Sequence, residues 1–235
     1  MCRMLAIMSS NPIDANLLLS FQQLAKKGKV AKGRRQGHAD GWGIVTYNDG
    51  APMYLGRQPT NAYSDPLFKG TCSAIRKNRV SGIVFFQLRK RSKGRKNIYN
   101  TPPLAMGNFC FMHNGTVHGL GNEGESDSVQ LLQIIFNEIS KYPTILEALR
   151  GVYHNVSRNY KYTSLTSILS NGRSVYAVKY VRSGEDEDYY DLMYAKKDGQ
   201  TIVSQEKTWP LNWQRIENKR VMIVHPDLET NILKM

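Results

Sequence analysis

Several features that mark common protein classes are scarce in this sequence of 235 residues. Its three cysteines, Cys2, Cys72 and Cys110, are odd in number and widely spaced, which argues against a disulfide framework and against a zinc cluster. The five histidines form no pair at the spacing of a helical metal site, so we expect neither a metal nor another cofactor. No apolar run is long enough to span a membrane, and the N-terminus lacks the features of a secretory signal, so we expect a cytoplasmic protein.

Acidic residues are scarce relative to basic ones, because 32 Lys and Arg stand against 19 Asp and Glu and give a net charge of +13. The excess gathers mainly in residues 26–35 and 89–96, and such clusters raise nucleic acid or an acidic protein as a partner. Both stretches contain Gly or Ser and almost no aromatic side chains on which bases stack. We therefore interpret them as solvated loops and treat nucleic acid as the less favoured partner.

Short apolar runs bounded by turn residues dominate the chain and predict β-strands. Asn48-Asp49-Gly50 and Ser170-Asn171-Gly172 are typical of hairpin turns, and we interpret the acidic residues 185–188 as a further hairpin tip. Apolar residues make up 41% of the chain, enough for a sizeable core without disulfides. The predicted strands span residues 3–8, 43–47, 53–55, 82–88, 109–113, 165–169, 175–180, 189–195, 201–204 and 221–224.

Three helices are predicted, and the first two carry apolar residues at helical spacing on one face. Ser126 or Asp127 can cap the second helix, and the third follows Pro143. Hairpins combined with a few amphipathic helices favour an α+β fold in which helices cover two stacked antiparallel sheets, within a single domain of residues 1–235. The predicted helices span residues 14–27, 126–140 and 144–160.

The second residue carries the strongest chemical signal. Because its side chain is small, the initiator Met1 can be removed, which leaves a thiol and a free α-amine on Cys2. An α-amine has an unperturbed pKa of about 7.7 to 8.0, so it can accept the thiol proton and later return it to a leaving amine. A retained Met1 would block this base. The structural alternative is an ordinary buried cysteine in a first strand.

A second chemical signal is His113-Asn114-Gly115, which follows a predicted strand. The Asn114 carboxamide and the Gly115 backbone N–H can donate to the oxygen that becomes negative when a thiolate attacks an amide, as in an oxyanion hole. His113 is interpreted as support for this turn. Without Cys2, a hairpin turn with positive φ would be the favoured interpretation of Asn-Gly.

Two further residues have side chains suited to the amino-acid end of a substrate. Arg89 ends a predicted strand, and its planar guanidinium can bind a carboxylate with two parallel hydrogen bonds. Asp127 begins a predicted helix and can accept hydrogen bonds from an α-ammonium group. The structural alternatives are a solvated basic run for Arg89 and a helix cap for Asp127.

Together these residues belong to a series of motifs in a characteristic order. The motifs are Met1-Cys2-Arg3-Met4-Leu5-Ala6, His38-Ala39-Asp40-Gly41-Trp42-Gly43-Ile44, Leu88-Arg89, Asn100-Thr101, Phe111-Met112-His113-Asn114-Gly115 and Ser126-Asp127-Ser128. The series resembles that of class II glutamine amidotransferases, and the chain looks like their stand-alone glutaminase-type members. Weaker similarity extends over nearly the whole chain.

The resemblance implies a fold, the four-layered αββα sandwich of N-terminal-nucleophile hydrolases, and glutamine or a related γ-glutamyl amide as the substrate. It also implies a role for each residue that matches a family motif. These roles are nucleophile for Cys2, oxyanion hole for Asn114 and Gly115, binding of the substrate carboxylate for Arg89, binding of the substrate amine for Asp127, and shaping of the pocket for the stretch that contains Gly41 and Trp42.

Two positions depart from close relatives of this family. Gln87 stands where they tend to have His two residues before the arginine, and Pro102 stands where their Asn-Thr-His-Pro motif has His. Neither change removes a core catalytic group. Both bear on pocket gating and substrate identity.

Three functions stay open on the sequence alone. The first is hydrolysis of glutamine through Cys2, with ammonia released to water or to a separate ammonia-acceptor protein. The second is hydrolysis of a larger γ-glutamyl amide by the same acylation step. The third is a catalytically weak relative that binds nucleic acid or an acidic partner through residues 26–35 and 89–96.

Overall fold

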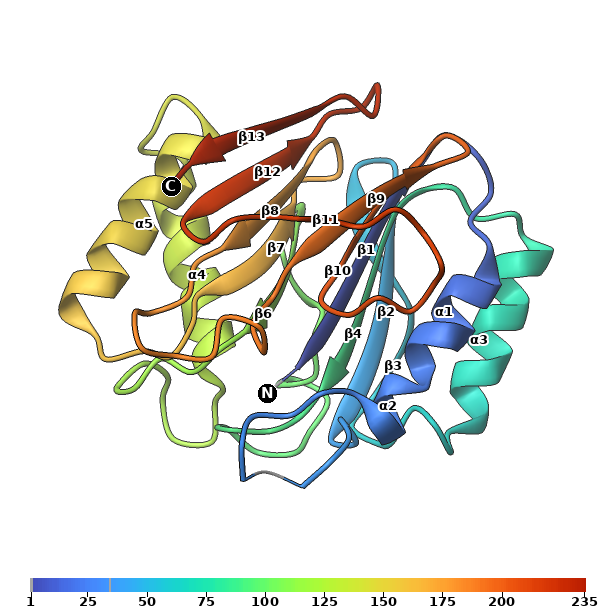
Figure 1. Ribbon diagram of the computed structural model, residues 1–235, viewed down its shortest axis with the longest axis horizontal. Coiled ribbons are helices and arrows are strands. Elements are labelled where there is room, and N and C mark those ends of the chain that lie inside the picture. Colours follow the sequence, from blue (N-terminus) through green and yellow to red (C-terminus); the bar gives the residue numbers. More distant parts are fainter. Residues whose placement is uncertain (1, 34) are drawn as a thin grey trace.

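The computed structural model describes residues 2–33 and 35–235. In these residues two antiparallel sheets lie face to face, and helices cover both outer faces (Figure 1). Three large apolar cores fill the spaces between the four layers, one under the helices of each outer layer and one between the sheets. The predicted α+β architecture, a four-layer αββα sandwich, is confirmed.

The first sheet is built around β1 (Arg3–Ser9), which is buried along its whole length. Leu5 and Ile7 contact the outer core under the helices, whereas Met4 and Ala6 contact the core between the sheets. A strand with two buried faces is apolar on both, so its sequence reads as a continuous run rather than an alternation. In spatial order the strands are β11 (Gln214–Arg215), β9 (Met193–Lys197), β10 (Gln200–Ser204), β1, β4 (Gly82–Arg89), β2 (Gly41–Asn48) and β3 (Ala51–Gln58), and the covering helices are α1 (Ala15–Gln22), α2 (Leu24–Lys27) and α3 (Pro66–Lys77).

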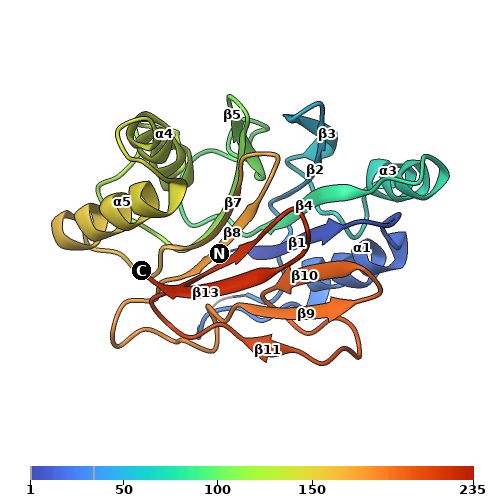
Figure 2. The ribbon, with the colours of Figure 1, turned by 90° about the horizontal axis from the view of Figure 1, so that it is seen from above.

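The second sheet is built around β6 (Phe109–Asn114), which is also buried along its whole length. Phe109 and Phe111 contact the core under its helices, and Cys110 and Met112 contact the core between the sheets. In spatial order the strands are β13 (Thr230–Lys234), β12 (Arg220–Val224), β8 (Val175–Lys179), β7 (Thr166–Ser170), β6 and β5 (Leu104–Met106), and the covering helices are α4 (Asp127–Ile139) and α5 (Ile145–Asn159). Figure 2 shows α4 and α5 on the opposite side of the molecule from α1 and α3.

Several local predictions differ from the structure. The predicted helix 14–27 is divided at Gln23 into α1 and α2, and α3, β5, β11 and β13 were not predicted. The acidic residues 185–188 are not a hairpin tip, because β8 and β9 on either side of them lie in different sheets. The predicted strand 189–195 begins only at Met193, because the backbone N–H of Tyr189 bonds to the Asp186 side chain instead of to a strand.

The fold brings three strand ends together at one edge of the inner core. Arg3 at the start of β1 pairs with Leu88 near the end of β4, and Gly41 at the start of β2 pairs with Arg89. The end of β6 approaches from the opposite sheet, beside the N-terminus (Figure 1). None of the helices formed by the described residues is long and apolar enough to cross a membrane.

Candidate active site

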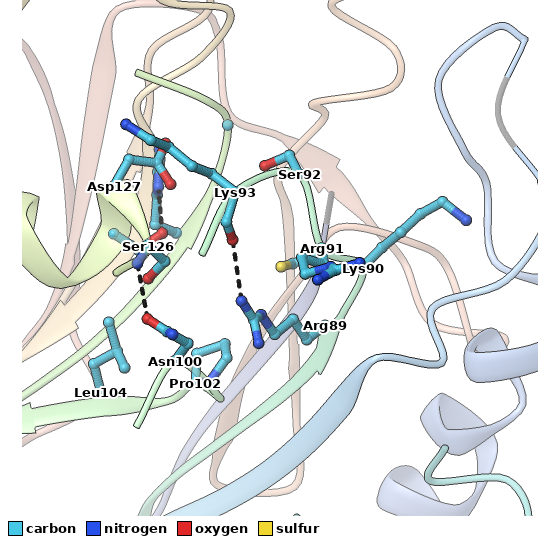
Figure 3. A pocket seen from close by; sticks show the side chains of 14 residues that line it. Arg89, Lys90, Arg91, Ser92, Lys93, Asn100, Pro102, Leu104, Ser126 and Asp127 are labelled. Carbon is cyan, nitrogen blue, oxygen red and sulfur yellow. Dashed lines mark hydrogen bonds between the residues drawn. The ribbon is translucent and has the colours of Figure 1, made fainter. Parts of the chain in front are cut away.

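A pocket lies where the ends of β1, β4 and β6 meet the start of α4 (Figure 3). Its cavity is small, about 30 Å³, because side chains of the loop after β4 fill part of it. A volume of this size holds about one water molecule, so a bound amino acid requires these side chains to move. The lining residues are Cys2, Arg89, Lys90, Arg91, Ser92, Lys93, Asn100, Pro102, Leu104, His113, Gly115, Ser126, Asp127 and Ser128.

Cys2 lies at the edge of this pocket, directly before β1, with a free and partly exposed side chain. Its backbone nitrogen donates to Asn114 Oδ1 at 3.0 Å. This bond joins residues that are 112 positions apart in the chain and come from opposite sheets. The predicted nucleophile and the predicted oxyanion residue are therefore in direct contact.

The Arg3 side chain holds the backbone around Cys2 in place. It is fully buried, forms an ion pair with Glu206, and donates to the carbonyl oxygens of Cys2 at 3.0 Å and Lys29 at 2.6 Å. Its guanidinium also lies over the Tyr189 ring, 4.6 Å from the centroid. Because donors on all three nitrogens of its planar guanidinium are used here, Arg3 fixes the direction in which the first strand enters the pocket.

Asn114 and Gly115 form the wall of the site opposite Cys2. Asn114 is fully buried, and its Nδ2 donates to Gln205 Oε1 at 3.2 Å while its Oδ1 accepts from Cys2. A carboxamide nitrogen carries two hydrogens, so one donor of Asn114 is used by Gln205 and the second is available for an oxyanion. A Cβ on Gly115 would lie 1.8 Å from the Ser164 carbonyl oxygen, so only glycine fits there.

His113 supports this wall from behind. Its Nε2 lies 3.1 Å from the carbonyl oxygen of Ser164, which can only accept, so Nε2 carries the proton. Its Nδ1 then accepts from the Ser128 hydroxyl at 2.9 Å. Burial lowers the pKa of His113, whereas Asp127 and the Ser164 carbonyl raise it, and the net shift keeps the ring neutral. We expected His113 to support this turn, and the contacts agree with that role.

Arg89 ends β4 with its guanidinium in the pocket and its side chain almost completely buried. Two of its donors are used by backbone carbonyls of the following loop, that of Lys93 at 3.2 Å (Figure 3) and that of Arg95 at 3.1 Å. Burial lowers the pKa of Arg89, and the neighbouring Cys2, Asp40 and Asp127 oppose that effect. A buried guanidinium is costly without an anion beside it, and its planar group has the geometry to bind a carboxylate.

Asp127 is the first residue of α4, on the far side of the pocket from Cys2, and is also buried. Its Oδ2 accepts from the backbone nitrogen of Val117 at 2.7 Å, so it does not cap its own helix. Asn100 holds the helix start, because its Oδ1 accepts from Ser126 N at 2.8 Å (Figure 3) and its Nδ2 donates to Gly124 O at 2.8 Å. The loop after β4 and the start of α4 are thus fastened together.

Gly41 and Trp42 lie outside the pocket wall that the described residues form. Trp42 is fully buried in the outer core, where its ring packs edge to face on Phe68 with centroids 5.2 Å apart and its Nε1 donates to Asp65. A Cβ on Gly41 would lie 2.9 Å from Thr101 Oγ1, so glycine lets the loop that carries Pro102 approach the sheet. The structure brings Gly41 to the pocket loop and places Trp42 in the core.

The two positions that depart from the family pattern have different surroundings. Gln87 is fully buried on β4 and donates from Nε2 to the His113 carbonyl at 2.9 Å, so it links the two sheets. Pro102 lines the pocket directly. The first substitution changes the support of the site, and the second changes its surface.

The sequence analysis assigned no role to the residues that brace the site from the C-terminal half of the chain, although residues 203–206 belong to the weaker family similarity. Gln205 and Glu206 follow β10. Gln205 is 91 residues from its partner Asn114, and Glu206 is 203 residues from its partner Arg3. Arg3, next to the candidate nucleophile, was the one accessible signal, since an arginine inside an apolar strand requires a buried acid. Among the described residues, no group of three or more His, Cys, Asp or Glu is placed to hold a metal ion.

A comparison with models of protein families assigns most of the chain to one family. Residues 1–185 match the model of the family described as glutamine amidotransferases class-II. The match covers well over half of the sequence, and the chain belongs to the class II glutamine amidotransferases. An uncharacterized protein of Methanocaldococcus jannaschii is 24% identical over 290 aligned residues, which cover 100% of this chain and 75% of that protein.

Solved structures share the fold at low sequence identity. A glutamine aminotransferase class-II domain protein from Silicibacter pomeroyi is 19% identical with a TM-score of 0.63, and the alignment covers 99% of both chains. The glutamine phosphoribosylpyrophosphate amidotransferase of Bacillus subtilis is 14% identical with a TM-score of 0.67. That alignment includes 99% of this chain but only 49% of the Bacillus subtilis chain. A predicted glutamine amidotransferase from Pseudomonas aeruginosa is 17% identical with a TM-score of 0.53, over 100% and 99% of the two chains.

Proposed function

We propose that this member of the family is an amidohydrolase that uses Cys2 to cleave the side-chain amide of glutamine or of a γ-glutamyl compound. The observation that carries the proposal is the 3.0 Å bond between the Cys2 backbone nitrogen and Asn114, at the edge of a pocket that also holds Arg89 and Asp127. After removal of Met1, that nitrogen is an α-amine held against the carboxamide of the oxyanion residue.

The first half of the reaction forms a thioester. The α-amine takes the Cys2 thiol proton, and the thiolate attacks the γ-carbonyl carbon. Asn114 Nδ2 and the Gly115 N–H donate to the oxygen that becomes negative. The carbon–nitrogen bond then breaks, the ammonium group returns its proton to the leaving nitrogen, and ammonia or an amine departs.

The second half of the reaction restores the enzyme. Water loses a proton to the α-amine and attacks the thioester, and glutamate leaves as the Cys2 thiol is reprotonated. Arg89 binds the α-carboxylate and Asp127 the α-ammonium of the glutamyl group throughout, which holds the γ-carbonyl at Cys2. To bind the carboxylate, Arg89 must replace its hydrogen bonds to the loop carbonyls with hydrogen bonds to substrate oxygens. Such a movement of the loop would also enlarge the small cavity.

The test combines the intact mass of the purified protein with ammonia or amine release from glutamine and a panel of γ-glutamyl amides. We expect a mass that lacks Met1, and release that disappears in Cys2→Ala. The matched control is Cys72→Ala, which removes a thiol buried under α3 and should retain release. A processed protein that is silent on the whole panel, or release that survives in Cys2→Ala, contradicts the proposal.

A second candidate function follows from one contact between the two basic stretches. Lys90 Nζ donates to the carbonyl oxygens of Arg35 and Gly37, at 2.9 Å for the latter, so the two basic loops lie together at the pocket mouth. Such a surface suits a binding module for an acidic protein or nucleic acid. Binding that weakens steeply with salt, together with no Cys2-dependent release, favours this alternative over hydrolysis.

A further inference from the structure

A second and larger cavity adjoins the candidate active site. Its volume is about 220 Å³, and it shares Lys90, Arg91 and Ser92 with the first pocket, so one short loop forms a wall of both. Five segments that are distant in the chain converge on it. The lining residues are Ala31, Lys90, Arg91, Ser92, Thr116, His118, Thr163 and Tyr189.

The lining of this cavity favours an anion. It contains two cationic side chains, a histidine and several hydroxyl groups, and no Asp or Glu lines it within the part of the chain that the structure describes. The hydroxyl-bearing residues are held by mutual contacts, with Ser92 Oγ 3.0 Å from Thr116 Oγ1 and Thr163 Oγ1 accepting from Thr116 N at 3.0 Å. Fixed hydroxyls beside two cations form the kind of environment that binds a carboxylate or a phosphate group.

Tyr189 contributes a buried polar group to the wall of this cavity. The residue is only 3% exposed, and its hydroxyl has no hydrogen-bond partner among the described residues. A buried hydroxyl without a partner is costly, so a small side-chain rotation that brings it to a ligand oxygen would be favourable. Burial raises the pKa of Tyr189, so the group stays protonated and serves as a donor.

The cavity is also connected to the chemistry through Arg3. One guanidinium nitrogen of Arg3 donates to the carbonyl oxygen of Cys2 at 3.0 Å and to that of Tyr189 at 3.3 Å. Tyr189 and Cys2 are therefore fixed relative to each other by a single rigid group. The second cavity also shares residues 90–92 with the pocket that holds Cys2 and Asp127, so an occupant would lie close to that pocket.

From this placement we propose that the second cavity binds the amine-side portion of the substrate, and that this portion carries a carboxylate or phosphate group. The inference rests on the proposed function and narrows it to γ-glutamyl amides of anionic amines. When the carbon–nitrogen bond breaks, the nitrogen takes the proton from the Cys2 ammonium and the free amine leaves from the second cavity. An anionic amine that accepts the glutamyl group from the thioester would occupy the same cavity.

The test is ligand binding by the Cys2→Ala protein, measured by calorimetry with two matched probes. γ-Glutamylglycine carries a carboxylate on its amine side, and γ-glutamylglycinamide carries a neutral amide in the same position. We expect γ-glutamylglycine to bind about tenfold more tightly or better, as one hydrogen-bonded charge provides. Equal affinity for the two probes overturns the inference.

Two variants locate the preference in the second cavity. Tyr189→Phe removes a hydroxyl that makes no hydrogen bond within the described chain, so the fold is expected to persist while most of the preference is lost. His118→Asp places a negative charge at the exposed rim and should abolish the preference, whereas His154→Asp makes the same change on the outer helix α5 and should retain it. A preference that is unchanged in both cavity variants overturns the inference.

Further measurements separate this inference from the proposed function. If the wild-type protein cleaves glutamine but shows no preference between the probes, the proposed function stands and the inference of an anionic amine side is refuted. No cleavage and no binding of either probe refutes both. Incubation with glutamine and glycine separates the two roles of the amine, because γ-glutamylglycine detected by mass shows that glycine accepts the glutamyl group, and glutamate alone rules out that acceptor role for glycine.

Discussion

The two ends of the candidate active site are built in different ways. At the end where we propose that the chemistry takes place, Cys2, Asn114 and Gly115 lie at the ends of strands in two packed sheets. At the end that we propose recognises the amino acid, Arg89 contacts the loop that follows β4, and two of its donors are occupied by carbonyls of that loop. One end is fixed by the core of the fold, and the other is completed by a surface segment.

This contrast separates the reaction from the choice of substrate. A position fixed by close packing tolerates no added atom, since packed interiors transmit strain instead of absorbing it. A position completed by a loop can exchange one set of hydrogen bonds for another when a ligand arrives. We therefore expect substitutions at the chemical end to reduce turnover, and substitutions at the recognition end to change substrate affinity and preference.

The largest effect is expected for Gly115→Ala, which tests whether the chemical end is as rigid as its packing indicates. The added methyl group would lie 1.8 Å from the Ser164 carbonyl oxygen and 2.8 Å from His113 Nε2. Backbone must therefore move, and we expect a loss of several kcal/mol in the free energy of unfolding, with no measurable turnover. Urea denaturation and ammonia release measure the two effects.

The control for this substitution is Gly70→Ala on α3. A Cβ at Gly70 meets no atom within 4 Å, and alanine is the better helix former, so stability should rise by about 0.5–1 kcal/mol. If Gly115→Ala were as harmless as Gly70→Ala, the contrast between the two ends of the site would not hold.

The next effect is expected for Asn114→Asp, which keeps the acceptor for the Cys2 nitrogen and removes the donor for the oxyanion. Loss of one such donor typically lowers kcat by about 10²–10³-fold. The control is Asn108→Asp, in the exposed turn between β5 and β6, where Nδ2 donates only to the Asn171 carbonyl at 3.3 Å. Single-turnover and steady-state kinetics should show the loss in kcat, and a change confined to KM would assign Asn114 to recognition instead.

A smaller effect is expected at the recognition end for Arg89→Lys. The charge is kept, but the planar fork that contacts two carboxylate oxygens is lost. We expect KM for glutamine to rise about 10-fold to 100-fold with a smaller change in kcat, as for a charged hydrogen bond. Arg173→Lys, in the hairpin turn after β7, is the control and should leave KM unchanged. An equal loss in kcat would show that Arg89 acts on the reaction itself.

The candidate site residues were predicted from the sequence because they carry local signals. A cysteine that directly follows the initiator methionine, an Asn-Gly pair after a strand and an arginine at a strand end can each be read within a few residues. Their bracing residues carry no such signal. Gln205, Glu206 and Ser164 contact the site only after both sheets have formed.

The same distinction applies to the fold. Continuous apolar runs such as β1 and β6 were predicted because burial on two faces requires them. The edge strand β13 was not predicted, because most of its residues are exposed and it pairs with β12 alone. The helix α3 had a usable signal, since Asp65 caps it, Pro66 begins it, and Phe68, Cys72 and Ile75 follow at helical spacing. Trp42 lies in the core for a reason the motif does not contain, the packing of α3 on its ring.

The smallest effect concerns pH, and it tests whether acid loosens the chemical end first. Burial lowers the pKa of His113 below its ordinary value of 6.5, so at acidic pH the unfolded chain binds a proton that the folded protein does not. The stability that the neutral ring provides is complete above pH 6.5 and is lost as the pH falls, with a slope of at most about 1.4 kcal/mol per pH unit. Urea midpoints measured at a series of pH values should therefore fall below pH 6.5 in the wild type and fall less in His113→Gln. His154→Gln, which removes an exposed histidine from α5, should keep the wild-type slope. If His113→Gln also keeps the wild-type slope, the acid sensitivity arises from groups other than His113, and acid does not loosen the wall behind Gly115 first.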